Sequence, residues 1–172
     1  MKKIIFSAFF LLLFFTSCNS RFKELAVGDT APMFTLKDQD NKTFDVKDYL
    51  GKKMLVIYFY PKDESSGCTK EACAFRDSFT DYSNAGAMVI GINNESVETH
   101  KKFQENHNLP FVLLSDPNKQ VINKFGVKNK FFMTGRETFV VDLNGKIAFV
   151  YNSEMQAVKH TTEALNFIKS KK

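Results

Sequence analysis

A seven-residue apolar run, Met54–Tyr60, ends abruptly at a proline, and it constrains the fold more than any other stretch of this 172-residue chain. The run is short for a helix, is rich in β-branched and aromatic residues, and hardly alternates polar with apolar side chains. Such a run is typical of a strand that is buried on both faces, as in a parallel sheet. Because Pro61 cannot continue a central strand, we expect the chain to turn there.

A short polar turn follows this run and leads to Cys68, which opens a predicted helix. Ser65 or Ser66 can cap that helix by accepting from the free amides of its first turn. Cys68 would then lie in the first turn, surrounded by unpaired N–H groups and the positive end of the helix dipole. Such surroundings favour the thiolate, which is the form of cysteine that attacks. The Ser65 hydroxyl can reach the same pocket and hydrogen-bond both the sulfur and a substrate oxygen.

The spacing of Cys68 and Cys73 is informative in itself. In an unbroken helix, five residues correspond to a rise of about 7.5 Å, which places the two Cα atoms roughly 8–9 Å apart. That separation exceeds the limit of about 7 Å for a disulfide. We therefore expect two thiols on a folded helix, and a disulfide only when the first turns of the helix unwind.

Two other uses of this cysteine pair fit the sequence less well. A structural disulfide would close so short a loop that it would stabilise the fold little, and the helical spacing opposes it. A metal site is weaker still, because two cysteines five residues apart with no nearby His match no common zinc spacing. We therefore expect neither a metal nor another cofactor.

The first 17 residues have the features of an export signal. Lys2 and Lys3 make the start of the chain basic, and Ile4–Phe15 form an apolar run that is too short to span a bilayer comfortably. Small residues precede Cys18, which resembles a bacterial lipoprotein signal. This resemblance implies cleavage before Cys18, acylation of that cysteine, and a protein held on a bacterial membrane, facing the periplasm or the cell exterior. A plain secretory signal and an uncleaved anchor remain alternatives.

Acylation of Cys18 would also account for the odd number of cysteines. The chain has three cysteines, and one odd thiol is unusual in an exported protein. With Cys18 lipidated, the other two form a redox pair. The sequence thus divides into a signal peptide at 1–17, a linker at 18–26 and one domain at 27–172.

Predicted strands and helices alternate through the domain, which indicates a three-layer α/β fold with a mixed sheet. The helix after Cys68 is expected to run to about Ser83, and another helix is expected to be capped by Asp116, with Pro117 at its first position and Gly126 just past its end. His100 and His107 are expected to be packed or solvated rather than ligands. The remaining predicted elements are a hairpin of Phe34–Lys37 and Thr43–Val46, strands Ala87–Ile92 and Phe111–Leu114, a helix over Val97–Asn106, a hairpin of Thr138–Val141 and Ile147–Tyr151, and a last helix that includes Ala157 and Ile168.

The charge pattern gives no sign of nucleic-acid binding. Lys and Arg number 24 against 19 Asp and Glu, for a net charge of +5. The basic residues are scattered along the chain, apart from Lys169, Lys171 and Lys172 at its end, which are expected to form a solvated tail.

Three blocks of sequence resemble peroxiredoxins of the bacterioferritin comigratory protein type, also called Q-type. They are PKDESSGCTKEACAFRD (61–77), Leu109–Val127 and Gly135–Ile147. The resemblance implies a thioredoxin-like fold with a central mixed sheet, flanking helices and an N-terminal hairpin. It also implies reduction of hydrogen peroxide and organic hydroperoxides, recycling by a thioredoxin-like dithiol, and a chain that is often monomeric.

The same resemblance assigns roles to individual residues. Cys68 matches the peroxidatic cysteine and Cys73 the resolving cysteine; Ser65 stands where Thr is usual, Pro61 shields the pocket, and Arg136 polarises the peroxide and supports the thiolate. The chain departs from the family at two places. Glu64, Ser65 and Ser66 replace a frequent Asn-Thr-Pro, and Lys128 stands where many members have Trp.

Two other functions remain open at this point. A membrane-tethered thiol–disulfide oxidoreductase of thioredoxin type would need Cys-x-x-Cys and a proline before the strand at Thr138, where this chain has Glu137. A non-catalytic lipoprotein that binds a partner or a metal would have unreactive cysteines.

Overall fold

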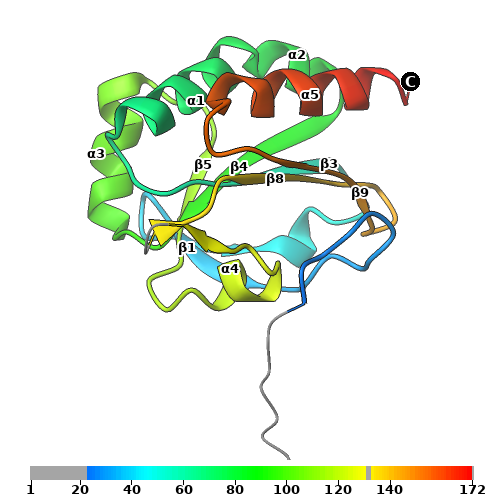
Figure 1. The fold of residues 1–172 in the computed structure, drawn as a ribbon, viewed down its shortest axis with the longest axis horizontal. Coiled ribbons are helices and arrows are strands. Elements are labelled where there is room, and N and C mark those ends of the chain that lie inside the picture. Colours follow the sequence, from blue (N-terminus) through cyan, green and yellow to red (C-terminus); the bar gives the residue numbers. More distant parts are fainter. Residues whose placement is uncertain (1–22, 131–132, 172) are drawn as a thin grey trace, which may run out of the picture.

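The computed structural model describes residues 23–130 and 133–171. The predicted signal peptide and the lipidation site Cys18 therefore lie outside the described residues. Most of the described chain folds around one seven-stranded mixed sheet with helices on both faces (Figure 1). Within residues 23–130 and 133–171, no helix is long and apolar enough to span a membrane.

The sheet has the strand order β2-β1-β5-β4-β3-β8-β9. Its centre is parallel, because β3 pairs with β4 and β4 with β5 in parallel, while β8 runs antiparallel to β3 on the other side. The predicted N-terminal hairpin is confirmed as the antiparallel pair β1–β2. The bounds are β1 Thr35–Asp38, β2 Thr43–Asp45, β3 Met54–Phe59, β4 Ala87–Asn93, β5 Val112–Ser115, β8 Glu137–Val141 and β9 Ile147–Asn152, with a separate short pair of β6 Asn129–Lys130 and β7 Met133–Thr134.

Strand β3 is buried on both faces, as the apolar run predicts. Val56 and Tyr58 point into one hydrophobic cluster, and Leu55, Ile57 and Phe59 into a second one on the opposite face. The first cluster lies beneath α1, α2, α3 and α5, and the second beneath α4 and the N-terminal segment (Figure 1). Because successive side chains of a strand point to opposite faces of the sheet, the apolar side chains of β3 need a covering layer on each face. The bounds are α1 Ser66–Asp77, α2 Phe79–Asn84, α3 Val97–His107, α4 Gln120–Lys124 and α5 Ala157–Lys169, with a 3₁₀ turn at Val46–Asp48.

The prediction of one helix from Cys68 to about Ser83 is wrong, because the structure divides it at Ser78 into α1 and α2. Serine favours helix ends over helix interiors, since its hydroxyl competes for backbone hydrogen bonds. The division lets α2 turn so that Tyr82 is buried and its hydroxyl donates to the carbonyl of Thr161 in α5, at 2.6 Å. Tertiary packing thus shortens the helix that carries both cysteines.

The prediction that Pro117 opens a helix is also wrong, because α4 begins at Gln120. Asp116 nevertheless caps this helix from a distance, since its carboxylate accepts from the amides of Gln120, Val121 and Ile122 at 2.8–2.9 Å. A turn of left-handed conformation at Lys119 intervenes. The capping residue was therefore identified correctly, but the chain uses a longer connection to reach the helix.

Gly126 ends α4, as predicted, and has a second role that only the fold reveals. Its φ is +72°, in the left-handed region that favours glycine. A Cβ at this position would lie 2.4 Å from the carbonyl oxygen of Lys23. The N-terminal segment can therefore pack against the end of α4 only because residue 126 has no side chain.

Candidate peroxidatic site

Cys68 lies in the first turn of α1, where the sequence places it. Ser65 is the N-cap, and its Oγ accepts from the Cys68 amide at 3.4 Å. The Ser65 hydroxyl itself donates to the carbonyl of Lys62 at 3.3 Å. Pro61 is half-buried in the bend between β3 and this turn. The Cys68 side chain is almost fully buried, at 1% exposure.

Arg136 reaches the Cys68 sulfur from a distant part of the sequence. Its Nη2 donates to Cys68 Sγ at 3.4 Å. The antiparallel pairing of β8 with β3 explains this contact, because Glu137 is the register partner of Phe59 at the end of β3. Arg136, the residue before β8, therefore lies beside the point where β3 ends and the loop that leads to Cys68 begins. The structure thus brings together Ser65, Cys68 and Arg136, as the sequence predicts.

Glu71 is a member of the site that sequence reasoning missed. It is fully buried on α1, three residues after Cys68, and forms a close ion pair with Arg136 Nη1. Burial raises the pKa of Glu71 to about 8, although the Arg136 charge and hydrogen bond oppose the shift. The signal in the sequence was its spacing, because residues i and i+3 share one face of a helix.

His160 completes this buried cluster from α5. Its Nδ1 lies 2.8 Å from Thr138 Oγ1 and 3.7 Å from Glu71 Oε1, and its Nε2 lies 2.9 Å from the carbonyl of Ser153. Burial lowers the pKa of His160 to about 4. At neutral pH the ring is therefore uncharged, with Nε2–H donating to Ser153 and Nδ1 accepting from Thr138.

A second buried network supports the loop that precedes Cys68. Asp63 accepts from the Tyr60 hydroxyl at 2.7 Å and from the Asn93 side-chain amide at 3.0 Å, and its Oδ2 lies 2.7 Å from Nδ1 of His100. The other ring nitrogen of His100 lies 3.2 Å from the carbonyl of Leu114. Both ring nitrogens thus lie within hydrogen-bond distance of an oxygen atom. His100 is packed, one of the two states predicted for it.

Cys73 lies two residues further along α1 than Glu71 and is half-buried. Both Cys68 and Cys73 are free thiols on one continuous helix, Ser66–Asp77. The helical spacing derived from the sequence therefore applies. The pair can form a disulfide only after part of α1 unwinds.

The comparisons with known proteins agree with this geometry. The model of the AhpC/TSA family matches residues 27–150. The chain is 47% identical over 156 residues to the chloroplastic peroxiredoxin Q of Sedum lineare, covering 90% of this chain and 83% of that protein. The crystal structure of peroxidoxin BcpB from Mycobacterium tuberculosis superposes with a TM-score of 0.82 at 33% identity, covering 87% of this chain and 99% of that one. The crystal structure of a cysteine-to-serine mutant of Xylella fastidiosa PrxQ matches with a TM-score of 0.79 at 26% identity, over 87% and 98% of the two chains.

The chain belongs to the AhpC/TSA family, as a peroxiredoxin of the Q type. In this peroxiredoxin, Cys68 is the peroxidatic cysteine and Cys73 the resolving cysteine. The fold is the thioredoxin-like peroxiredoxin fold that the resemblance implies. Family membership favours the peroxidase over both alternatives, the oxidoreductase of thioredoxin type and the non-catalytic lipoprotein.

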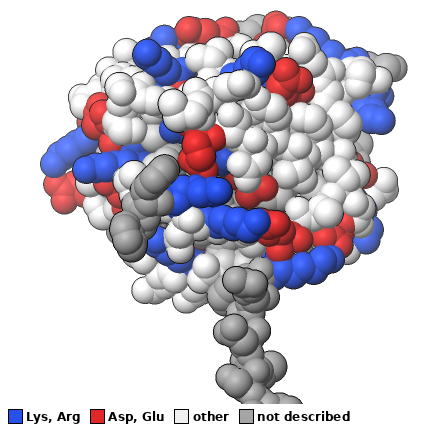
Figure 2. Space-filling model, viewed as in Figure 1, with Lys and Arg blue, Asp and Glu red and all other residues white. Residues whose placement is uncertain are grey.

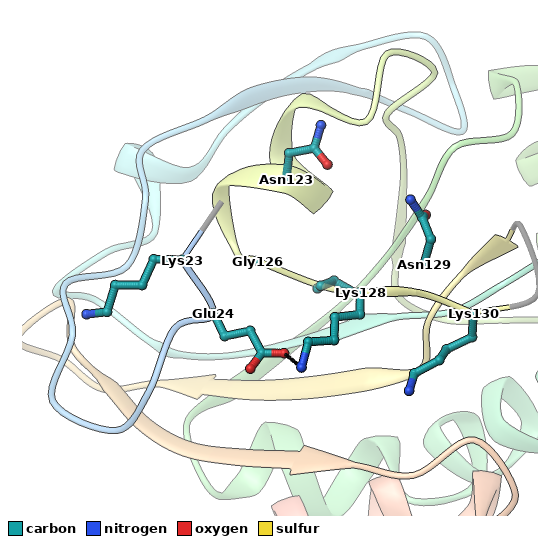
Figure 3. A pocket seen from close by; sticks show the side chains of 8 residues that line it. Lys23, Glu24, Asn123, Gly126, Lys128, Asn129 and Lys130 are labelled. Atoms are coloured by element: carbon teal, nitrogen blue, oxygen red, sulfur yellow. Dashed lines mark ion pairs between the residues drawn. The ribbon is translucent and has the colours of Figure 1, made fainter. Parts of the chain in front are cut away.

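One large cavity in the described part of the peroxiredoxin is separate from the cysteine site. It has a volume of about 950 Å³ and lies between the N-terminal segment and the end of α4 (Figure 3). An ion pair of Glu24 with Lys128 crosses one side of it (Figure 3). A smaller pocket, of about 450 Å³, lies beside the start of α1 and includes Ser66 and Gly67. Among the described residues, no group of three or more His, Cys, Asp and Glu side chains is placed to hold a metal ion.

Acidic and basic side chains are mixed on the surface of the peroxiredoxin. On the face seen in Figure 2, Lys and Arg lie beside Asp and Glu rather than in one continuous basic patch. Exposed ion pairs such as Lys23–Asp29 and Lys169–Asp81 are part of this pattern.

Proposed function

We propose that this peroxiredoxin reduces hydrogen peroxide and organic hydroperoxides in a two-cysteine cycle that begins at Cys68. The observation that carries the proposal is the 3.4 Å contact between Arg136 Nη2 and Cys68 Sγ at the start of a helix. A guanidinium and the free amides of a first turn both stabilise negative charge on sulfur.

In the first step the Cys68 thiolate attacks one oxygen of the peroxide. The S–O bond forms as the O–O bond breaks, and Cys68 becomes a sulfenic acid while the leaving oxygen takes a proton and departs as water or an alcohol. Arg136 stabilises the charge that develops on the breaking O–O bond. The Ser65 hydroxyl turns from Lys62 to the bound peroxide, and Pro61 shields the pocket from bulk water.

In the second step Cys73 attacks the sulfur of the Cys68 sulfenic acid. The S–S bond forms, the S–O bond breaks, and hydroxide leaves and is protonated to water. Because both cysteines lie on α1, this step requires the first turns of the helix to unwind. A thioredoxin-like dithiol then supplies two electrons and two protons and restores both thiols.

Titration of the reduced protein with one equivalent of peroxide tests this cycle. Mass spectrometry should find the Cys68–Cys73 disulfide in the wild-type chain and a sulfenic acid at Cys68 in the Cys73→Ser variant. The Cys68→Ser variant should lose turnover. Peroxide consumption that survives in Cys68→Ser would contradict the proposal. Amide exchange that protects α1 equally in the reduced and oxidised proteins would contradict the unwinding step.

We also propose that the mature protein is a monomer anchored to a bacterial membrane through lipid on Cys18, facing the periplasm or the cell exterior. The support for the anchor is the sequence alone: the apolar run, the small residues before Cys18 and the odd cysteine count. The support for the monomer is the resemblance to Q-type peroxiredoxins. In cells, labelled fatty acid should appear in the wild-type protein and be absent from Cys18→Ser. A soluble wild-type chain cleaved at another position would overturn the anchor, and a stable dimer at micromolar concentration in light scattering would overturn the monomer.

A further inference from the structure

Glu64 lies in the loop just before the cap of α1, and the end of α3 holds its side chain. Its Oε1 accepts from Asn106 Nδ2 at 2.8 Å, and its Oε2 lies 2.8 Å from Nε2 of His107. These hydrogen bonds lower the pKa of Glu64, the one with His107 most and the one with Asn106 next. Both carboxylate oxygens are engaged, although the Glu64 side chain is 48% exposed. The loop that leads to Cys68 is therefore attached to α3.

The backbone of Glu64 has an uncommon conformation. Its φ is +56°, in the left-handed region that residues with a side chain seldom adopt. Such a conformation persists only where the surrounding structure holds it in place. The two contacts with α3 supply that restraint. If they are broken, the loop loses part of what keeps it in this conformation.

His107 also contacts the opposite end of α1. Its carbonyl lies at the end of α3 and accepts from Nη1 of Arg76, in the last turn of α1, at 2.9 Å. The last carbonyls of a helix have no intrahelical partner, so this hydrogen bond satisfies one of them. The His107 ring packs edge-on against Phe103 of α3, with the ring centroids 5.1 Å apart. The end of α3 thus contacts the chain on both sides of the two cysteines.

These two attachments differ in what happens to them when α1 unwinds. Unwinding of the first turns displaces Ser65 and its neighbour Glu64, which breaks the contacts of Glu64 with α3. The contact of Arg76 lies beyond Cys73 in the sequence and can remain. The Glu64 contacts therefore add to the free energy that unwinding requires, whereas the Arg76 contact does not.

We propose that Glu64 is a positioning residue that sets the rate of the second step of the cycle. Its contacts with Asn106 and His107 hold the loop before Cys68 in the arrangement that reacts with peroxide, and so delay the meeting of the Cys68 sulfenic acid with Cys73. The proposal rests on the two-cysteine cycle proposed above.

This delay has a chemical consequence when peroxide is in excess. The sulfenic sulfur of Cys68 can attack an oxygen of a second peroxide molecule before Cys73 arrives. A second S–O bond forms as the O–O bond breaks, water or an alcohol leaves, and Cys68 becomes a sulfinic acid that the thiol cycle does not reduce. Glu64 therefore also sets how readily excess peroxide inactivates the enzyme.

Hydrogen exchange of the reduced full-length protein tests these contacts without any peroxide. In Glu64→Ala, amides in the first turns of α1 should exchange about three- to ten-fold faster, the range that two partly exposed contacts supply. Asn106→Ala should accelerate exchange in the same turns while Glu64 is intact. Amides of β4 should be unchanged in both variants, because the opening is local. Equal acceleration in β4 would show a loss of global stability and would overturn the proposal.

Single-turnover kinetics measure the two steps separately. Glu64→Ala should convert the sulfenic acid to the disulfide about three- to ten-fold faster than the wild type. It should also accumulate less Cys68 sulfinic acid in excess peroxide, as measured by peptide mass spectrometry. Glu64→Gln still offers an oxygen to Asn106 and should lie between Glu64→Ala and the wild type. An unchanged disulfide rate in both Glu64→Ala and Asn106→Ala would overturn the proposal.

The matched control is Glu98→Ala, which breaks an exposed ion pair with Lys102 within α3, at 2.9 Å, and should change neither measurement. The double variant Glu64→Ala/Asn106→Ala should behave as Glu64→Ala alone, because Asn106 acts through Glu64. Additive effects of the two substitutions would overturn that link. Absence of sulfenic acid in the wild-type chain would instead refute the peroxidase cycle, while the exchange rates would still show whether Glu64 holds the start of α1.

Discussion

Two buried carboxylates, Asp63 and Glu71, flank Cys68 in the sequence, yet their surroundings differ. Asp63 has a partner for each oxygen, from Tyr60, Asn93 and His100. Glu71 has the Arg136 ion pair on one oxygen, while its Oε1 and the Nε of Arg136 have no hydrogen-bond partner among the described residues. Both carboxylates lie within a few residues of the same cysteine.

This difference indicates that the two carboxylates have different roles. A fully satisfied buried network fixes one conformation, because each of its members would be left unpaired if the loop moved. In the Glu71–Arg136 pair, Glu71 Oε1 and Arg136 Nε are still able to form hydrogen bonds when charge develops at the site. We therefore regard the Asp63 network as the support of the cysteine loop, and the Glu71–Arg136 pair as part of the reacting site. The predictions below test this assignment from the largest expected effect to the smallest.

Asp63→Ala should destabilise the fold by about 3–5 kcal/mol, because it leaves His100, Tyr60 and Asn93 without their buried acceptor. Urea denaturation followed by circular dichroism measures the change. Asp40→Ala, which breaks an exposed contact with Lys101, is the control and should change stability far less, because solvent screens an exposed pair. Equal losses in the two variants would remove the distinction between a supporting network and an ordinary ion pair.

Arg136→Gln should lower kcat/KM for peroxide by about 10²–10³, the usual effect of removing one donor to a developing negative charge. It also leaves Glu71 buried without its cation. Adding Glu71→Gln should restore much of the lost stability, since the buried carboxyl that has lost its guanidinium partner is then gone as well, but should not restore the rate. Competition kinetics and urea denaturation of the single and double variants give both quantities. Recovery of the rate in the double variant would show that Arg136 acts only through the fold.

Glu71 should make stability depend on pH. Its pKa is raised from the ordinary 4.5 to about 8 in the folded protein, so the folded state binds this proton more tightly than the unfolded chain. Its contribution is therefore fully present below about pH 4.5 and is lost as the pH rises through about 8. Between these values the Glu71 proton should make stability fall by about 1.4 kcal/mol per pH unit. Glu71→Gln should remove this part of the slope and leave the part due to Glu137, whose pKa burial raises to about 7.

The control for this slope is Glu98→Gln. Glu98 is exposed, and its hydrogen bond with Lys102 lowers its pKa, so it stays ionised across the same range. Its replacement should leave the slope unchanged. An unfolding free energy that changes equally with pH in the wild-type chain and in Glu71→Gln, between about pH 5 and 8, would contradict the buried, proton-binding character of Glu71.

Ser65→Ala should cost about 1 kcal/mol of stability through the loss of the helix cap. Ser96 caps α3 in the same way, accepting from the Thr99 amide at 3.2 Å, and Ser96→Ala is a matched control. Both variants should lose similar stability in thermal unfolding, but only Ser65→Ala should lower the peroxidase rate. Equal rates in the two variants would reduce Ser65 to a helix cap.

Much of the site could be predicted from the sequence because its parts are local. Ser65, Cys68 and Cys73 lie within nine consecutive residues, and helix geometry fixes their relation once the cap is known. Arg136 was predicted from the family resemblance, not from its position. Glu71 and Asp63 were missed because closeness to Cys68 in the sequence does not by itself separate a buried acid from a surface one. Their burial depends on elements that come later in the chain, namely β8, α3 and α5.

The sequence by itself determined a doubly buried β3, a turn at Pro61 and a helix that begins just before Cys68. These follow from side-chain periodicity, backbone restriction and capping, which act over a few residues. Only the tertiary structure decided where the helix ends, which charge reaches the Cys68 sulfur, and which acids are buried. The reason is that burial and ion pairing are set by contacts between residues far apart in the chain, such as Cys68 with Arg136 and Asp63 with His100.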